Sequence, residues 1–224
     1  MYQDKNKEYF NNLRMDLISL IPENENNRIL EIGAGSCETL IEIKKLKLAK
    51  EVVGVELIKL EDSQQDNPEI DRLIIGNIED LEIDLPGNYF DVIICGDIIE
   101  HLIEPEAALR KLHNHLKQNG IIILSIPNFR EYHILYRVLI LADFRYTDRG
   151  ILDRTHMRFY CKKNIISLLI SAKYVPISIY SMFQFGKVQR TRKIINTLTF
   201  GLIRDFLTSQ YIIIAKKAGF ETNQ

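Results

Sequence analysis

The chain has few cysteines, little net charge and no long apolar run, and each shortage excludes a class of protein. Its three cysteines, Cys37, Cys95 and Cys161, are far apart and form no CxxC pair, so they match neither a disulfide framework nor a zinc site. A formal net charge of −1 over 224 residues gives no overall attraction to nucleic acid. No apolar run approaches the ~18 residues of a membrane-spanning helix.

These absences favour a cytoplasmic protein. The first residues, MYQDKNKEYF, are too polar for a secretory signal. With 46% hydrophobic and 26% charged residues, the composition is that of an ordinary globular protein. We find no internal repeat, low-complexity segment or linker rich in Gly, Ser or Pro. The sequence therefore predicts a single domain over residues 1–224.

Short apolar runs alternate with helical patterns along the first half of the chain. The runs cover residues 28–32, 52–56, 72–76, 90–95 and 121–126, and helical patterns cover 38–49 and 105–117, the second ended by Asn119-Gly120. Such alternation predicts a parallel sheet covered on both faces. Later, residues 163–173 predict a helix, and runs at 175–182 and 211–217 predict an antiparallel pair that closes the sheet edge.

The first of these runs leads into a glycine-containing turn, Glu31-Ile32-Gly33-Ala34-Gly35-Ser36-Cys37-Glu38. Gly33 and Gly35 permit a close approach of the backbone to a ligand. A dinucleotide site would have a third glycine at position 38, but Glu38 and Glu31 disfavour a pyrophosphate. The two acids suit a ligand with cationic centres, such as S-adenosylmethionine, which has a sulfonium, an ammonium and no phosphate. Glu56, 21 residues after Gly35, is placed to accept the hydroxyls of a ribose.

The series ILEIGAGSC, VVGVE, GNIED, FDVIICGDIIEHL and IIILSIPN resembles the ordered motifs of class I S-adenosylmethionine-dependent methyltransferases over residues 28–128. The later stretch DRTHMRF is similar to the D-x-T-H-x-R-F of ubiquinone-type O-methyltransferases and of methyltransferases in surface-sugar pathways. The resemblance implies an α/β, Rossmann-like fold: a mostly parallel seven-stranded sheet with an antiparallel last strand and helices on both faces. It also implies methyl transfer that leaves S-adenosylhomocysteine, on an oxygen of a small molecule or of a glycan- or lipid-linked precursor.

The resemblance also implies roles for individual residues. Those assigned to the cofactor are Glu31, Gly33 and Gly35 for its methionine half, Glu56 for the ribose, Asn77 and Ile78 for the adenine, and Asp97 near the methyl group. Two positions depart from the family pattern. Cys37 replaces the commoner glycine of the turn, and Asn77 replaces the commoner aspartate but keeps a hydrogen-bonding side chain.

Histidine chemistry is expected at His156, inside LDRTHMRFY, because a neutral imidazole can take the proton of an attacking hydroxyl. We pair it with Asp97 as the candidate catalytic residues; the alternative is a histidine that caps the following helix. Glu100 and His101 complete a D-x-x-E-H cluster with Asp97. This cluster is either a helix cap with a structural histidine or, as in some family members and joined by His156, a site for magnesium or manganese. The other histidines, His113, His115 and His133, are expected on surfaces or helix faces.

Two further segments are expected to determine which methyl acceptor the protein binds. Residues 129–160 predict a substrate lid, with a helix indicated by Ile134, Val138 and Leu141; the alternative is a helix that covers the core. Residues 183–208 form a basic amphipathic crossover that contains Lys187, Arg190, Arg192, Lys193 and Arg204. The favoured interpretation is a helix between two strands with solvated basic side chains, and the alternative is a stretch that contacts anionic lipid or a phosphorylated substrate.

Three classes of function and partner stay open at this point. The favoured partner is a small-molecule or glycan acceptor, with no nucleic acid. Contact of the basic crossover with a membrane or polymer would instead suit a non-catalytic docking module. A nicotinamide-dependent oxidoreductase is disfavoured by Glu38 and by the absent third glycine.

Overall fold

The computed structural model describes residues 13–80, 85–183 and 187–218. The expectation about the polar start, MYQDKNKEYF, lies outside the described residues. The strands are β1 (Arg28–Ile32), β2 (Glu51–Glu56), β3 (Arg72–Ile75), β4 (Phe90–Gly96), β5 (Leu116–Pro127), β6 (Tyr174–Met182) and β7 (Gln210–Lys217). The helices are α2 (Met15–Ile18), α3 (Glu38–Lys45), the short 3-10 helix η2 (Ile99–His101), α4 (Pro105–His115), α5 (Tyr132–Leu139), α6 (Lys162–Ser171), α7 (Lys187–Leu198) and α8 (Arg204–Leu207).

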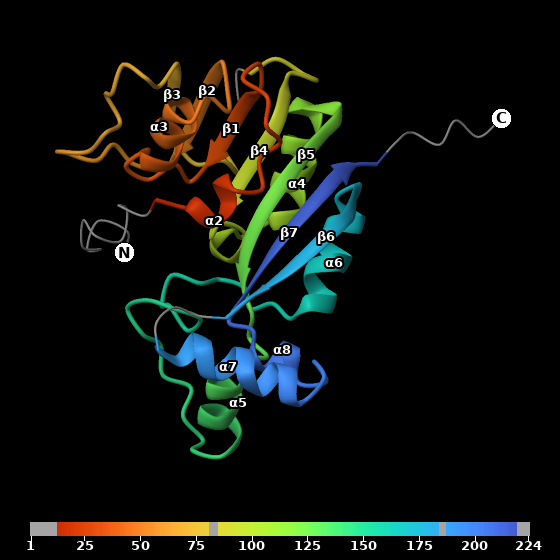
Figure 1. Cartoon of the computed structure of the whole chain (residues 1–224). Helices are drawn as coiled ribbons and strands as arrows, with labels where there is room; N and C mark the ends of the chain where they lie inside the picture. The colour runs from red at the N-terminus through yellow and green to blue at the C-terminus, as the bar shows by residue number, and fades with distance from the viewer. Residues whose placement is uncertain (1–12, 81–84, 184–186, 219–224) are drawn as a thin grey trace.

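Within the described residues the strands form one seven-stranded sheet in the order β3-β2-β1-β4-β5-β7-β6 (Figure 1). The strands from β3 to β5 pair in parallel, whereas β7 runs antiparallel to both of its neighbours, β5 and β6. The predicted fold is therefore confirmed, including the antiparallel last strand and the late pair at the sheet edge.

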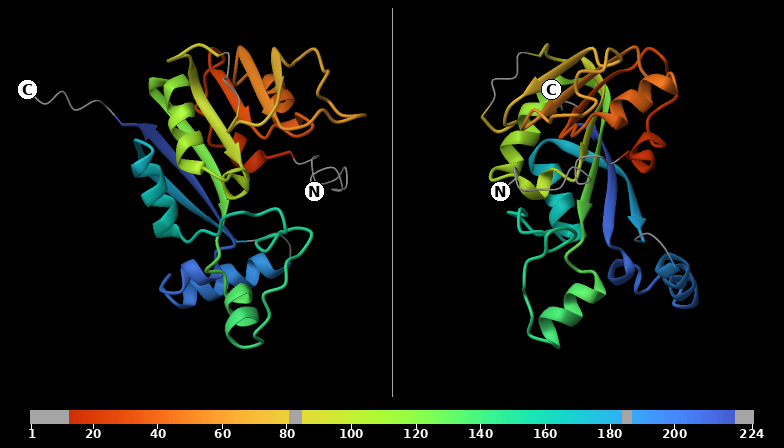
Figure 2. Two further views of the ribbon diagram at one scale, coloured as in Figure 1. Left: turned by 180° about the vertical axis from the view of Figure 1, so that it is seen from behind. Right: turned by 90° about the vertical axis from the view of Figure 1, so that its left-hand side faces the viewer.

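The central strands are buried on both faces because nearly all of their residues are apolar. Side chains alternate along a strand, so Leu30 of β1 packs in one core cluster with Leu109 of α4, while Ile29 packs in another with Leu40 of α3. Each such side chain contributes about 1.5–3 kcal/mol to folding. Figure 2 shows the helices on the two sides of the sheet. The apolar runs of the central strands therefore leave neither face of the sheet exposed there.

Two helices end earlier than their sequence patterns predict. Helix α3 ends at Lys45 rather than at 49, and Lys47 beyond it has a left-handed backbone with φ 56°. Helix α4 ends at His115, and Asn119-Gly120 does not end it, because both residues lie inside β5. A Cβ at Gly120 would come within 2.7 Å of Leu116 Cδ1, so this glycine serves close packing at the start of β5.

After β5 and again before β7, the chain forms a separate part of the molecule that we call the distal unit, residues 129–150 and 187–207. It contains α5, α7 and α8 and lies beyond the end of the sheet at which β4 and β5 finish (Figures 1 and 2). Helix α5 buries Ile134 alone and ends at Leu139, so the predicted third apolar position, Leu141, lies outside it. The helix therefore does not cover the sheet.

Asn128 links the two stems of the distal unit, by which we mean the chain where it enters residues 129–150 and the chain where it leaves residues 187–207. Its side chain is fully buried and its Nδ2 donates to the carbonyl oxygens of Asp205 and Thr208, at 2.7 and 2.8 Å. Its backbone N–H donates to the Ser209 carbonyl at 2.9 Å. No helix within the described residues is both long and apolar enough to cross a membrane.

Candidate active site

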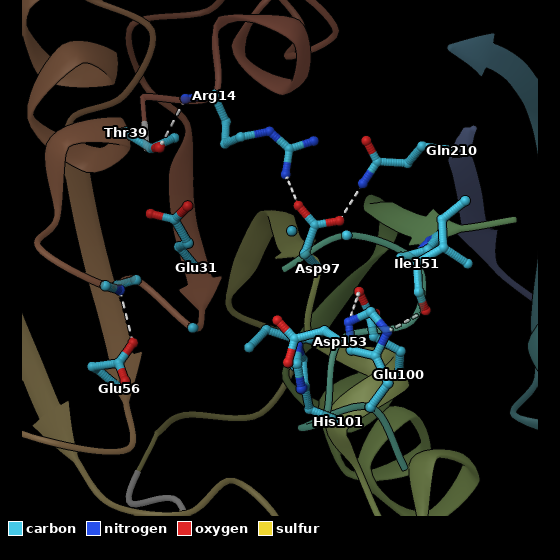
Figure 3. A pocket seen from close by; sticks show the side chains of 18 of the residues that line it. Arg14, Glu31, Thr39, Glu56, Asp97, Glu100, His101, Ile151, Asp153 and Gln210 are labelled. Carbon is cyan, nitrogen blue, oxygen red and sulfur yellow. Dashed lines mark hydrogen bonds and ion pairs between the residues drawn. The ribbon is translucent and has the colours of Figure 1, made fainter. Parts of the chain in front are cut away.

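A cavity of about 360 Å³ lies where β1, β2 and β4 end. Strand β1 and its turn contribute Glu31, Gly33 and Gly35, and β2 contributes Glu56. Asp97 follows β4 on the opposite wall, next to η2 (Figure 3). In an open parallel sheet this edge is the usual place for a ligand.

The glycine turn brings the backbone close to its neighbours. Gly33 and Gly35 have φ values of 73° and 53°, which suit glycine. A Cβ at Gly33 would lie 2.2 Å from Ile98 Cδ1, so no larger residue fits without a shift of Ile98. Cys37 also has a left-handed backbone, with φ 70°, just before α3. That conformation explains why glycine is commoner there, and the buried Cys37 side chain belongs to the core instead.

Two buried carboxyl groups form the wall that contains β1 and β2. Glu31 is 4% exposed, and burial raises its pKa to about 8, against the opposing effect of Arg14. Its Oε2 has no hydrogen-bond partner within the described residues. Glu56 accepts from the backbone N–H groups of Gly35 at 2.7 Å and Leu57 at 2.8 Å. Burial raises the pKa of Glu56 as well, and these two hydrogen bonds oppose the rise.

Arg14 is the cavity residue that the sequence patterns did not indicate. It immediately precedes α2 and forms ion pairs with Asp97 and, at 2.9 Å, with Asp16. Its guanidinium also donates to Ser125 Oγ at 2.9 Å. Burial would lower the pKa of Arg14, but the two aspartates outweigh it and raise the pKa. Of the described residues that line the cavity, Arg14 is the sole lysine or arginine.

Asp97 lies at the end of β4, as the resemblance implies, and is engaged by several donors. Arg14 and the Gln210 side-chain amide contact its two carboxylate oxygens, and the Ser125 hydroxyl donates to it at 3.2 Å (Figure 3). Its backbone has φ 55°, a strained value for a residue other than glycine. Burial raises the pKa of Asp97, while Arg14 and Ser125 oppose the rise.

Glu100, His101 and His156 form a separate cluster, with one ligand atom of each lying within 4.8 Å of the others. His156 Nε2 lies 3.9 Å from Glu100 Oε1, and the two imidazole rings meet edge to face with centroids 4.7 Å apart. Nδ1 of His101 lies 3.0 Å from the Thr155 carbonyl and Nδ1 of His156 lies 2.9 Å from the Ile151 carbonyl. Because a carbonyl only accepts, each Nδ1 carries a proton, and in the neutral imidazole the lone pair is then on Nε2.

Glu100 supplies the carboxyl group of this cluster. It is 1% exposed, and neither of its carboxylate oxygens has a hydrogen-bond partner within the part of the chain that is described. Burial and the nearby Asp97 raise its pKa well above the ordinary value. Its backbone carbonyl accepts from Met157 and Arg158, which attaches the DRTHMRF segment to η2. Within this segment, the Asp153 carboxylate accepts hydrogen bonds from the backbone N–H and the hydroxyl of Thr155 and so stabilises the local turn.

The structure brings together most of the residues that the sequence singles out. Eight line the cavity: Glu31, Gly33, Gly35, Glu56, Asp97, Glu100, His101 and His156. Asn77 and Ile78 are not among the described lining residues. Asn77 instead bonds to Asp80 and to the Glu79 N–H, and Ile78 is buried in the core. Of the histidines expected on surfaces or helix faces, His113 lies on the buried face of α4, with its ring edge-on to Tyr174.

Comparisons with known proteins agree on one family. The model of the methyltransferase domain family matches residues 5–175. The ubiquinone biosynthesis O-methyltransferase of Xanthomonas euvesicatoria is 28% identical over 124 residues, which cover 53% of this chain and 50% of that protein. The enzyme of the same name from Chromobacterium violaceum is 29% identical over 136 residues, 56% of this chain and 57% of that protein. This chain thus spans about half the length of these curated relatives.

Solved structures share the fold at lower identity. A SAM-dependent methyltransferase from Archaeoglobus fulgidus superposes with a TM-score of 0.67 at 20% identity and covers 95% of both chains. An S-adenosylmethionine-dependent methyltransferase from Mesorhizobium loti gives a TM-score of 0.64 at 15% identity, covering 96% of this chain and 99% of that one.

Proposed function

This chain belongs to the methyltransferase domain family, and we propose that it moves a methyl group from S-adenosylmethionine to an oxygen of a small molecule or of a glycan- or lipid-linked precursor. The fold is that of class I S-adenosylmethionine-dependent methyltransferases. The observation that carries the proposal is Glu31, a buried acid in the cavity whose Oε2 has no partner. Such an atom is costly unless a ligand satisfies it.

Individual cavity residues match individual chemical groups of S-adenosylmethionine, the methyl donor. Glu31 would bind the ammonium of the methionine half, and Arg14 would bind its carboxylate. Glu56 would accept the ribose hydroxyls, and Gly33 lets the Ile98 side chain pack directly against the turn that borders the cavity. Contact of Asn77 and Ile78 with the adenine stays a prediction. When bound, S-adenosylmethionine supplies an electrophilic methyl group on a positively charged sulfur.

His156 is the proposed general base. Its Nδ1–H is held by the Ile151 carbonyl, so Nε2 is the atom that would take the proton from the acceptor hydroxyl. Asp97 holds Arg14 and Gln210 and thereby positions the wall beside the methyl group. Most of the acceleration would come from alignment of the acceptor oxygen with the methyl carbon at ~3–3.5 Å.

The same cluster also fits a divalent cation. Two imidazole Nε2 atoms and a buried carboxylate without partners are a suitable donor set for manganese or magnesium. Glu100, His101 and His156 would hold the ion, which would supply a positive charge to stabilise an acceptor oxyanion. Asp97 is not part of this set, because Arg14 and Gln210 occupy its carboxylate.

Calorimetry with S-adenosylmethionine, S-adenosylhomocysteine and NAD⁺ tests the donor. We expect binding of the first two; no binding of either at millimolar ligand, or binding of NAD⁺ instead, would overturn the proposal. A labelled-methyl screen over nucleotide sugars, quinone precursors and phenols then tests the reaction. Donor binding without any transfer would favour the alternative, a non-catalytic module that docks on a membrane or polymer.

Two histidine variants separate the base from the ligand role. His156→Ala should slow turnover and leave donor affinity unchanged. His101→Ala should leave turnover nearly intact if His156 acts as a base alone, but should remove calorimetric Mn²⁺ binding and chelator-sensitive activity if the cluster holds a metal. A cytoplasmic location stays a prediction from the sequence.

A further inference from the structure

The large apolar side chains with the greatest exposed fraction in the described part of the chain belong to the distal unit. The five large apolar residues with the greatest exposure all belong to it: Phe200 (92%), Leu202 (86%), Leu198 (73%), Leu139 (72%) and Ile140 (69%). They come from the end of α5 and from the segment between α7 and α8, which lie at the same end of the molecule (Figures 1 and 2). Exposed apolar patches of this kind mark contact surfaces.

Helix α7 buries polar side chains and exposes apolar ones beside its basic residues. Arg192 is 3% exposed, and its guanidinium bonds to Glu131 at 2.5 Å and to the Leu207 carbonyl at 2.9 Å. Asn196, one turn further on, has a buried Oδ1 without a partner among the described residues. Ile194 and Leu198 face outward. A crossover helix that served only to cover a core would have the opposite arrangement.

The charge of the distal unit is also distinctive. It contains nine lysines and arginines against four acids, a net charge of +5 in a chain whose total is −1. Three of the acids pair inside the unit: Glu131 with Arg192, Asp143 with Arg137 and Arg145, and Asp205 with Arg130. Arg190, Lys193 and Arg204 are exposed beside the apolar side chains. Helices α7 and α8 and the segment between them therefore expose both basic and apolar side chains.

From these observations we propose that the distal unit docks on the surface of an anionic lipid bilayer. Phe200, Leu202 and Leu198 enter the boundary between headgroups and acyl chains, and the exposed arginines and lysine contact lipid phosphates. A second copy of this chain is a poorer occupant, because an isologous contact would place two units of charge +5 against each other. The inference goes beyond the proposed methyl transfer and does not depend on it.

A single tryptophan tests insertion directly, since the chain contains none. Phe200→Trp places the fluorophore at the proposed tip, and Ile170→Trp places it at a comparably exposed site on α6, outside the distal unit. With vesicles of phosphatidylcholine and phosphatidylglycerol we expect a blue shift and quenching by bilayer-embedded probes for Phe200→Trp only. Equal responses from both variants, or none from Phe200→Trp, would overturn the proposal.

Sedimentation of the full chain with the same vesicles measures affinity. Phe200→Ser with Leu202→Ser, and separately Arg190→Glu with Lys193→Glu, should each weaken binding by at least about tenfold. The matched control, Lys50→Glu with Lys163→Glu, changes two exposed lysines elsewhere and should bind like the wild type. Circular dichroism verifies folding. Binding that ignores the distal substitutions, or a dimer in solution that Phe200→Ser and Leu202→Ser abolish without any vesicle binding, would refute docking on lipid.

Discussion

Binding of S-adenosylmethionine should release one proton at mildly acidic pH, and Glu31 should be its source. Burial raises the pKa of Glu31 to about 8 in the cavity without ligand, with Arg14 opposing the rise. At about pH 6, such a group is ionised in only ~1% of molecules. Pairing with the donor's ammonium needs the carboxylate form, so the apparent affinity near pH 6 should be about a hundredfold below that of the ionised protein.

Above about pH 8 the donor loses its own ammonium proton, because an α-amino group titrates near 8. The affinity should therefore be greatest near pH 8 and fall on both sides. Calorimetry at about pH 6.5 in two buffers of different ionisation enthalpy counts the proton. We expect close to one proton released by the wild type and none by Glu31→Gln, while Glu38→Gln, a nearby acid outside the cavity lining, should match the wild type. No release by the wild type, or equal release by Glu31→Gln, would refute the reasoning.

The same group gives the protein without ligand a pH-dependent stability. The folded pKa of Glu31 lies above the ordinary value of 4.5, so between about 4.5 and 8 the folded state holds a proton that the unfolded state has lost. The free energy of unfolding should therefore fall as pH rises through this window, by up to about 1.4 kcal/mol per pH unit. Glu31→Gln should remove its share of that slope in thermal melts, while the share of Glu56, Asp97 and Glu100, whose pKa burial also raises, should remain.

Three further substitutions probe the turn, the ribose contact and the distal unit. Gly33→Ala should cost about 2–4 kcal/mol of stability and abolish donor binding, whereas Gly150→Ala, which has φ +88° but open space around it, should cost only ~1–2 kcal/mol in denaturant titrations. Glu56→Ala should weaken donor affinity by about 10–100-fold in calorimetry without unfolding the protein; unchanged affinity would remove Glu56 from the site. Arg192→Met removes the arginine partner of the buried Glu131, which keeps only the N–H groups of His133 and Ile134 and the His133 ring, and should cost about 3–5 kcal/mol in denaturant titrations.

The sheet and the glycine turn could be predicted because their signals are local. Apolar runs such as 90–95 are continuous where both faces are buried, and Gly33 and Gly35 follow the first run directly. The end of α4 could not be predicted in this way, because Asn119-Gly120 is a common turn signal and indicates a later end of the helix. Here β5 begins at Leu116 to pair with Phe90, and this tertiary pairing overrides the local preference.

The cavity shows the same division between local and long-range signals. Glu31 and Glu56 are found from their distance to the glycines, whereas Arg14 reaches the cavity from a segment without a motif and engages Asp97 across 83 residues. That ion pair is why Asp97 does not join Glu100 and the histidines. The spacing of Ile194 and Leu198 predicts an amphipathic helix but not which side faces solvent; the buried Arg192–Glu131 pair determines that side.

Asn128 fastens the far end of the molecule to the sheet, and that end reaches the cavity through Gly150. Both stems of that end meet at this single buried amide, which holds them with bonds to Asp205, Thr208 and Ser209. A change in the length or sequence of this end would therefore alter the cavity wall as well, so the two regions do not vary independently.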